Sequence, residues 1–335
     1  MKTAVVIPNW NGEMWLREAL DSLLSQTVPL TLIVVDNGSS DSSRDILKSY
    51  NDQIITIYRE KNYGFTGGVN PGIEYAIEHG YDAVALFNND AVANKNWLKR
   101  LQDEMKDDIG IVTCSLQTFD RKYIDSTGDQ LTVWGLPYPR GRHTPVVNSP
   151  TEPEYIFSAS GGATLYSIPM LKEIGFFDDD FFAYYEDVDI SYRAQLTGWK
   201  VKINPTAVAY HRINATSSRM NSGFTVYQTF KNLPIVNIKN TPVGLRHIIY
   251  PRFILAYVSF FFSALFRGQG WPALQGFFKF VSLIPKKLRE RRVIQASKKV
   301  DSQYIFSIMT HDLPENSTKL RKLRVLWWKI TGKNI

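Results

Sequence analysis

Cysteine is almost absent from this chain of 335 residues, in which Cys114 stands alone. A single thiol cannot form an internal disulfide, so small disulfide-stabilised folds are excluded and a reducing compartment is consistent with the sequence. The first residues also lack the apolar stretch and cleavage pattern of a signal peptide. We therefore expect a cytoplasmic protein whose stability comes from a hydrophobic core.

Two common nucleotide-binding loops are missing as well. No GxxxxGK[ST] phosphate loop occurs in the sequence. The first predicted strand is followed by Pro8 and Asn9, where the dinucleotide-binding fingerprint would require glycines. The glycine-rich segment 62–70 comes only after the third predicted strand. Any nucleotide site in this chain must therefore be built in another way.

Long apolar runs are scarce. Residues 253–266 form an apolar run of 14 residues between two arginines, whereas a membrane-spanning helix needs about 20. We expect this run to be too short to cross a membrane. A second patch occupies residues 276–284, and one face of a predicted final helix carries Leu320, Leu323, Trp327 and Ile330.

Acidic residues are rare in the last part of the chain. Residues 241–335 contain 17 Lys and Arg against 4 Asp and Glu, whereas residues 1–240 contain 22 against 28. Basic helices with apolar faces and tryptophan are typical of segments that lie in a membrane surface. We expect a membrane surface as partner and no nucleic acid. A helical subdomain packed on the core, or a homodimer contact, is the alternative.

Short apolar runs alternate with segments of helical periodicity. Strands are predicted at residues 3–7, 30–35, 54–58, 83–87, 110–113, 163–166, 200–203 and 207–210. Helices are predicted at residues 15–26, 42–50, 71–79, 96–105, 169–174 and 188–196, and residues 120–153 are predicted to be rich in loops. This alternation predicts an α/β fold with a doubly wound, mostly parallel, Rossmann-like sheet.

The fourth predicted strand ends in Asn88, Asn89 and Asp90. Ligands of open α/β sheets bind outside the carboxyl ends of the strands. Divalent cations such as Mg²⁺ and Mn²⁺ take oxygen ligands, often carboxylates together with substrate phosphates. This strand end is therefore a candidate site for a cation and a diphosphate, although polar residues there can also simply cap a strand.

Three further acidic or basic positions have two interpretations each. Asp36 ends the second predicted strand, where it can bind a ribose or base, or cap the next helix. Glu186 and Asp187 follow a segment rich in aromatic residues, whose burial raises a carboxylate pKa towards that of a useful base; acids in a first helical turn also favour the helix dipole. A lone histidine such as His211 is more often structural than a ligand.

Taken together, the motifs resemble the family 2 inverting glycosyltransferases of the GT-A fold, and within them the rhamnosyltransferase-like branch. They occur in family order over roughly the first 215 residues. The matching segments are VVIPNWN (5–11), VVDNGSSD (34–41), NYGFTGG (62–68), FNND (87–90), GFFD (175–178), YYEDVD (184–189), GW (198–199) and His211.

The resemblance implies a role for each matching residue. Donor binding would fall to Pro8, Asn9, Asn11, Asp36, Asn62, Gly64, Gly67, Gly68, Asn70, Asn88 and Asn89. Asp90, His211 and Asn88 would hold Mn²⁺ or Mg²⁺, with the neutral Asn88 where the family's DxD motif has its first carboxylate. Asp187, next to Glu186, would be the general base.

The resemblance also implies two domains and a set of partners. Residues 1–215 would form the GT-A catalytic domain, and residues 216–335 a basic, membrane-associated helical region. The donor would be a dTDP- or UDP-sugar, with dTDP-rhamnose as first guess. The acceptor would be a lipid-linked glycan or polysaccharide at the cytoplasmic face of the cell membrane, in cell-surface glycan synthesis.

Two other functions stay open at this point. A sugar nucleotidyltransferase would need a basic, glycine-rich triphosphate loop near the N-terminus, and residues 8–12 contain neither Lys nor Arg. A membrane- or nucleic-acid-binding scaffold would use the basic tail and leave the sheet catalytically silent. Co-sedimentation with liposomes against DNA separates the two scaffolds, and donor hydrolysis detects an active sheet.

Overall fold

The computed structural model describes residues 1–212 and 222–312. Its strands are β1 (Thr3–Asn9), β2 (Thr31–Asp36), β3 (Ile55–Tyr58), β4 (Ala83–Phe87), β5 (Ala91–Ala93), β6 (Ile109–Thr118), β7 (Ile124–Ser126), β8 (Asp129–Leu131), β9 (Pro137–Pro139), β10 (Glu154–Tyr155), β11 (Ala163–Ser167) and β12 (Lys200–His211). Its α-helices are α1 (Leu16–Leu24), α2 (Ser43–Ser49), α3 (Gly64–Glu78), α4 (Trp97–Glu104), α5 (Ile168–Ile174), α6 (Glu186–Leu196), α7 (Phe224–Asn240), α8 (Arg246–Phe266), α9 (Gly270–Ala296) and α10 (Ser302–Ser307).

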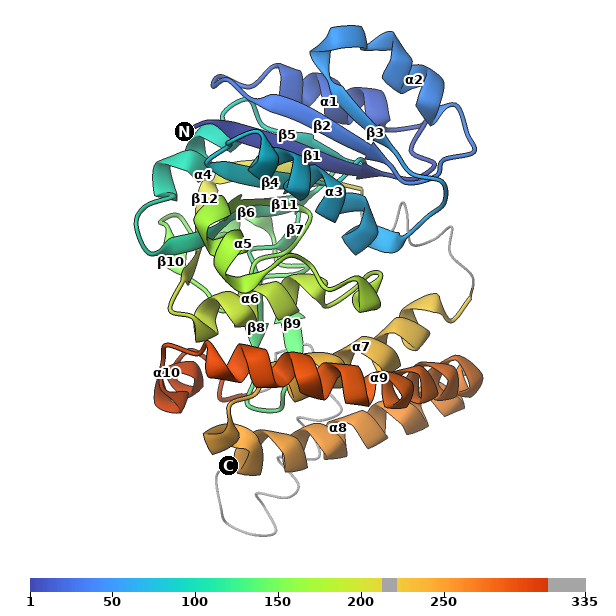
Figure 1. The fold of residues 1–335 in the computed structure, drawn as a ribbon, viewed down its shortest axis with the longest axis vertical. Coiled ribbons are helices and arrows are strands. Elements are labelled where there is room, and N and C mark those ends of the chain that lie inside the picture. Colours follow the sequence, from blue (N-terminus) through green and yellow to red (C-terminus); the bar gives the residue numbers. More distant parts are fainter. Residues whose placement is uncertain (213–221, 313–335) are drawn as a thin grey trace.

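One large sheet forms the centre of the N-terminal part (Figure 1). Its strands follow the order β10–β12–β6–β11–β4–β1–β2–β3, with β5 paired to β12 and β7 paired to β6. Strands β4, β1, β2 and β3 run parallel to one another, and β6 is parallel to β12. Strand β11 lies antiparallel between β4 and β6. The predicted α/β fold with a mostly parallel sheet is therefore confirmed.

Helices cover both faces of the sheet because successive side chains of a strand point to opposite sides. In β1, Val5 and Ile7 pack in a core with α1, α2 and α4. Ala4 and Val6 pack in a second core with α3, α5 and α6. The central strands such as β1 consist of continuous apolar residues in the sequence because both of their faces are buried.

Three sequence predictions need correction. The strands predicted at 200–203 and 207–210 are one strand, β12, with an irregularity between Asn204 and Val208. The segment 120–153, predicted to be loop-rich, contains the short strands β7, β8 and β9. Helix α3 begins at Gly64 instead of Pro71, so Pro71 lies inside it. Glycines in α3 allow the helix to approach β1 closely, and this packing outweighs the low helix propensity of the segment.

Helices α7, α8 and α9 stack beneath the sheet layer, with α8 farthest from the sheet (Figure 1). The apolar run 253–266 lies within α8, and the segment Val243–Phe266 has 24 residues and contains an 18-residue window with a mean hydropathy of 1.7. The expectation that this segment is too short to cross a membrane is therefore wrong on length, although a single helix of this kind is weak evidence for a span. The predicted final helix at 320–330 lies outside the described residues.

Replacing Gly72 by alanine tests the contact between α3 and β1. A Cβ at Gly72 would lie 2.5 Å from Val6 Cγ1, so Gly72→Ala should lower the free energy of unfolding by about 1–3 kcal/mol through overpacking, despite the better helix propensity of alanine. Urea unfolding measures the change. Glu74→Ala, at an exposed position of the same helix, is the control and should shift stability by less than about 0.5 kcal/mol. Equal stability of the two variants would contradict the close packing.

Candidate active site

A cleft of about 630 Å³ opens where the carboxyl ends of β1 and β4 face the N-terminus of α6. Ten of the predicted site residues line it: Pro8, Asn9, Asn62, Gly64, Asn88, Asn89, Asp90, Glu186, Asp187 and His211. Five predicted residues do not line it: Asn11, Asp36, Gly67, Gly68 and Asn70. The polar strand ends therefore meet at one edge of the sheet, as expected for an α/β ligand site.

Side-chain amides connect the ends of β1 and β4. Asn89 Nδ2 donates to Asn9 Oδ1 at 2.8 Å, and Asn9 Nδ2 lies 3.4 Å from Asp36 Oδ1 and 3.2 Å from Ser39 Oγ. Asp36 is fully buried and accepts from Arg44 Nε at 2.8 Å. Asp36 therefore positions Asn9 and the turn after β2 without lining the cleft itself. The predicted contact of Asp36 with a nucleoside stays a prediction.

Asn37 joins the second strand end to the start of α3. Its Nδ2 donates to Asn62 Oδ1 at 3.1 Å and to the Gly64 carbonyl at 2.8 Å, while its Oδ1 accepts from the Tyr63 amide at 3.1 Å. Asn37 also lines the cleft. The sequence did not single out this residue, although it lies in the VVDNGSSD segment that suggested Asp36.

The remaining predicted donor residues support the cleft from outside. A Cβ at Gly68 would lie 2.9 Å from Pro8 Cβ, so the glycine allows α3 to lie close behind β1. Asn70 Nδ2 donates to the Phe177 carbonyl at 2.8 Å and so ties α3 to the loop before α6. Asn11 accepts from the Ser40 amide at 2.8 Å. In the structure these residues position backbone segments of the cleft.

His211, at the end of β12, lies among polar groups of the predicted metal site. Its Nε2 is 3.1 Å from Asp90 Oδ1 and 3.4 Å from Asn88 Nδ2. Its Nδ1 is 2.8 Å from Asp125 Oδ2, and the other oxygen of Asp125 pairs with Arg142 at 2.9 Å. Burial opposes a positive charge on the ring, yet the hydrogen bonds to Asp125 and Asp90 raise the pKa of His211 to about 9.

These residues fit a hard divalent cation. Neighbouring ligands of an octahedral cation with bonds of about 2.1 Å lie about 3 Å apart, and Asp90 Oδ1 and His211 Nε2 are separated by 3.1 Å. A histidine that binds a metal through one nitrogen commonly donates from the other to a carboxylate, and Asp125 is placed to accept from Nδ1. Metal binding would require Nε2 to lose its proton.

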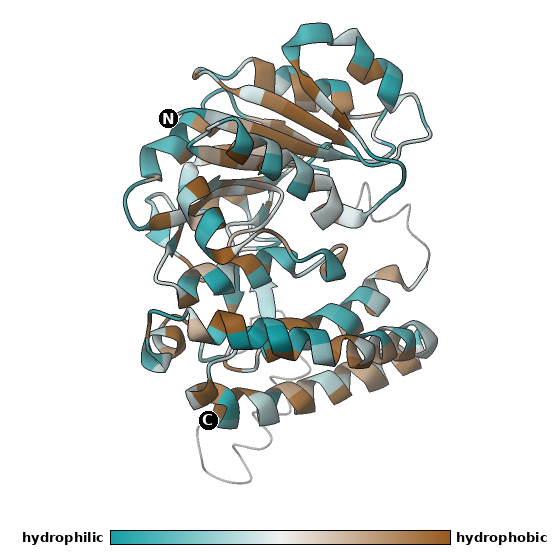
Figure 2. Cartoon of the chain, in the orientation of Figure 1, coloured by the Kyte–Doolittle hydropathy of each residue, from teal (hydrophilic) through white to brown (hydrophobic). Residues whose placement is uncertain are grey.

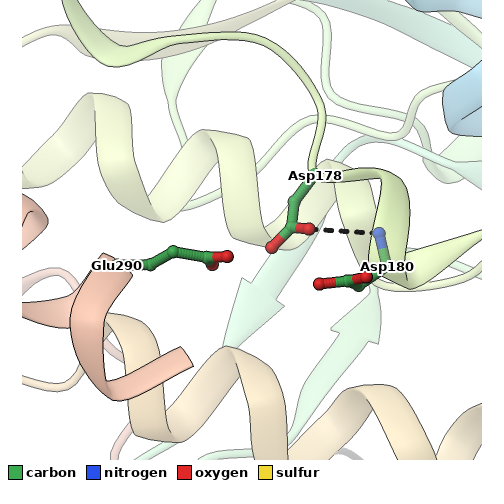
Figure 3. Close-up of side chains that lie close together, drawn as sticks. All are labelled: Asp178, Asp180 and Glu290. Carbon is green, nitrogen blue, oxygen red and sulfur yellow. Dashed lines mark hydrogen bonds between the residues drawn. The ribbon is translucent and has the colours of Figure 1, made fainter. Parts of the chain in front are cut away.

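A second group of carboxylates, Asp178, Asp180 and Glu290, also comes within ligand distance of one another (Figure 3). Lysines already neutralise this group. Lys287 Nζ lies 2.6 Å from Asp178, 2.7 Å from Asp180 and 3.0 Å from Glu290, and Lys239 lies 2.6 Å from Asp178. A cation would have to displace these ammonium groups, so we interpret the cluster as a structural ion-pair network.

Asp187 occupies the first turn of α6, on the wall of the cleft. Its Oδ2 accepts from the Gly161 amide at 3.1 Å, and its Oδ1 from the Val188 amide at 2.9 Å. Burial raises the pKa of Asp187 above its usual range, while these backbone hydrogen bonds oppose the rise. Burial, followed by repulsion from Asp187, raises the pKa of Glu186 well above normal.

The loop before β11 touches both parts of the site. Gly161 binds Asp187, and the Gly162 carbonyl accepts from the Asn88 amide at 2.9 Å. A Cβ at Gly162 would lie 3.2 Å from Asn88 Nδ2. This glycine pair therefore spaces the predicted metal residues from the predicted base, a role that the sequence did not reveal.

The loop directly before Glu186 and Asp187 is strained. Phe182, Tyr184 and Tyr185 have φ angles of 64°, 69° and 70°, and left-handed φ in such large residues costs roughly 1–3 kcal/mol each. Asn232 of α7 compensates this cost. Its Nδ2 lies 3.0, 2.8 and 2.8 Å from the carbonyl oxygens of Phe181, Ala183 and Tyr184.

Sequence reasoning missed Asp125, Arg142 and Asn232. The first two lie in the segment 120–153, which has no motif and no clear periodicity, so the sequence contains no signal for them. Asn232 is fully buried in α7. The available signal is a polar amide directly before the apolar residues 233–236, because buried amides need partners.

The fold and the cleft define a class of protein. A mixed, mostly parallel sheet with polar strand ends, and with acids at the start of a facing helix, is the arrangement of the GT-A glycosyltransferases. The family model "Glycosyl transferase family 2" matches residues 4–183, more than half of the chain. The chain belongs to glycosyl transferase family 2.

Individual relatives and solved structures agree with this assignment. The low-salt glycan biosynthesis hexosyltransferase Agl10 of Haloferax volcanii is 24% identical over 238 residues, covering 68% of this chain and 73% of that protein. The S. aureus TarS 1–349 structure in complex with UDP matches 94% of this chain and 95% of its own, with a TM-score of 0.55 and 17% identity. The GalNAc-T7 structure with UDP, GalNAc and Mn²⁺ matches 71% of this chain and 48% of its own, with a TM-score of 0.58 and 16% identity. At these identities the two structures establish the fold alone.

Two carboxylate substitutions distinguish the metal site from the ion-pair network. Asp90→Asn should weaken Mn²⁺ binding by about tenfold or more, because it removes a charged ligand. Asp178→Asn should leave Mn²⁺ affinity unchanged and lower stability by about 3–5 kcal/mol, because it leaves buried lysines without a partner. Calorimetric titration measures affinity, and thermal unfolding measures stability.

If Asp178→Asn does not fold, Glu290→Gln replaces it, since the Glu290 side chain is 29% exposed. If Asp178→Asn or Glu290→Gln lost Mn²⁺ binding while Asp90→Asn kept the wild-type Mn²⁺ affinity, the metal site would be the carboxylate network and not Asp90 and His211.

Asn232→Ala tests the support of the strained loop. The variant leaves buried carbonyls without a donor, which costs about 1–3 kcal/mol, and it should reduce kcat more than it raises the donor KM. Ile235→Ala, at a fully buried position of the same helix, should cost about 2–5 kcal/mol of stability and leave kcat nearly unchanged. Equal effects of the two variants on kcat would mean that general destabilisation explains the loss.

Proposed function

We propose that the protein transfers a sugar, with inversion, from a nucleoside-diphosphate sugar to a hydroxyl of a lipid-linked glycan or polysaccharide acceptor in cell-surface glycan synthesis. One observation carries the proposal. The buried carboxylate of Asp187 and the Asp90–His211 pair line the same cleft, and the loop 160–162 contacts both sides. This arrangement supports the proposal of a base and a diphosphate-binding end within one cleft.

The residues support a single displacement. The acceptor hydroxyl would attack the anomeric carbon while the carboxylate of Asp187 takes the proton of this hydroxyl. In the same step the bond from the anomeric carbon to the diphosphate would break and the bond to the acceptor oxygen would form. A positioned general base typically contributes about 10²–10⁴-fold to rate. A divalent cation at Asp90 and His211 would neutralise charge on the leaving diphosphate. Attack from the side opposite the leaving group gives inversion without a covalent intermediate.

The choice of donor rests on relatives and on motifs. TarS 1–349 has been solved with UDP and with UDP-GlcNAc, and a Pyrobaculum calidifontis mannosyltransferase has been solved with GDP-Man and Mn²⁺. We extend to this chain a nucleotide-sugar donor and the use of Mn²⁺ or Mg²⁺. The motifs that resemble the rhamnosyltransferase-like branch make dTDP-rhamnose the first donor to test, ahead of UDP-sugars.

We assign donor binding and catalysis to residues 1–215, and the positioning of the enzyme at the cytoplasmic membrane face to residues 216–335. Donor identity is best tested by thermal shift with a panel of dTDP-, UDP- and GDP-sugars, since a ligand that binds only the folded state raises Tm. The anomeric configuration of the product, read by NMR, tests inversion.

Asp187→Asn should abolish transfer while donor binding persists, because the amide keeps the shape of the side chain but cannot accept the proton. In the wild type, kcat/KM should rise with pH as Asp187 deprotonates, at a pH above the usual Asp pKa of about 3.9 because burial raises that pKa. Asp52→Asn, at an exposed position, is the matched control. Wild-type turnover in Asp187→Asn would show that another residue is the base.

A further inference from the structure

Helix α8 has two different faces. Four of its apolar side chains, Ile249, Phe253, Ala256 and Ala264, are buried. Six others are between 45% and 87% exposed, and we call them the bare face of α8: Ile254, Leu255, Val258, Phe262, Leu265 and Phe266. At about 100° per residue these six fall within about one third of the helix circumference, opposite the buried set. A soluble helix normally places polar residues on such a face.

The buried face of α8 packs on α7. Phe253 and Ala256 share a cluster with Leu233 of α7, and the Tyr257 hydroxyl donates to the Phe230 carbonyl at 2.7 Å. Among the stacked C-terminal helices α8 is the farthest from the sheet (Figure 1), and apolar colour runs along much of its length (Figure 2). The bare face therefore points away from the catalytic sheet.

The charge around the bare face is almost entirely positive. Residues 246–296, which form α8, α9 and their connection, contain nine Lys and Arg against Glu290 alone, and all of the nine except Lys287 and Arg291 are at least partly exposed. Arg267, directly after the helix, is exposed, and Trp271 at the start of α9 is 69% exposed. Apolar side chains beside arginine and tryptophan match the boundary between lipid headgroups and acyl chains.

We propose that the bare face of α8, together with Arg267 and Trp271, docks in the plane of an anionic lipid surface. The helix is long enough to span a membrane, but its buried side chains already pack on α7 and α9, and a span would expose that packing to lipid. Docking a second copy of the chain would bring two strongly basic surfaces together, which like-charge repulsion opposes. This proposal does not depend on the identity of the sugar donor.

Docking in this way seats on the lipid a helix that also packs against one wall of the cleft. Leu136 and Tyr138, on the loop and strand beside the cleft, pack with Phe253 and Ala256 of α8, and Tyr185 contacts the same cluster. Tyr138 and Tyr185 line the cleft. One wall of the cleft is therefore packed on the inner face of the docked helix.

Vesicle flotation tests the proposal. The full chain should float with phosphatidylcholine vesicles that contain phosphatidylglycerol, and less with phosphatidylcholine alone. The triple variant I254N/V258N/F262N should reduce binding by about tenfold or more, because three apolar side chains no longer enter the lipid. Arg267→Ala should reduce binding to the anionic vesicles about fivefold and leave phosphatidylcholine binding unchanged.

Val147→Asn is the matched control, since Val147 is 86% exposed and lies outside α8; it should bind vesicles as the wild type does. Thermal unfolding must show that the triple variant is folded. Unchanged flotation of the triple variant overturns the proposal. Resistance of the wild-type protein to alkaline extraction from membranes would show a membrane span and would also overturn the proposal. A third contrary result is a wild-type protein that does not bind vesicles and forms a dimer that the triple variant abolishes. Sugar transfer to a soluble acceptor, measured in parallel, reports on catalysis separately.

Discussion

The ion pairs between the loop before α6 and the C-terminal helices are the constraint on which the rest of the site depends. Lys239 of α7 contacts Asp178 and Asp189, and Lys287 of α9 contacts Asp178 again. Both lysine side chains are almost completely buried. Desolvating such charges costs several kcal/mol per ion unless each finds partners. Opposing that cost, the lysines hold the pKa of the Asp178 carboxyl far below its usual range.

This network fixes the backbone on both sides of the predicted base. Asp178 and Asp180 precede the strained loop, and Asp189 follows Asp187 by two residues in α6. Asn232 of α7 then holds the carbonyls of the loop between them. The left-handed aromatic residues can persist because contacts on both flanks over-determine the loop. The C-terminal helices therefore support the backbone on both sides of the predicted base, although the family match ends at residue 183.

The features that sequence could predict are local. The buried strands are continuous apolar runs, and their polar ends at Asn9 and Asn88 mark the edge of the sheet where the cleft lies. The start of α3 could not be predicted, because its glycines and Pro71 disfavour a helix and only packing against β1 selects it. The partners of His211 could not be predicted either. Asp125 reaches it across 86 residues of sequence, from a segment without periodicity.

Contacts between residues far apart in sequence also explain why the segment 120–153 and the C-terminal helices, which contain few motifs, contribute to the candidate site. Family motifs bring the donor residues to the strand ends, where backbone geometry alone places them. The proposed base needs more, since Asp187 directly follows a strained loop whose backbone carbonyls must be hydrogen-bonded by other elements. Helix α7 does so with Asn232 and also carries α8 on its other side through Leu233 and Phe230. Docking of α8 on a lipid surface, as proposed above, would therefore act on the helix that holds the loop before Asp187, and would couple the position of the enzyme to the geometry of the proposed base.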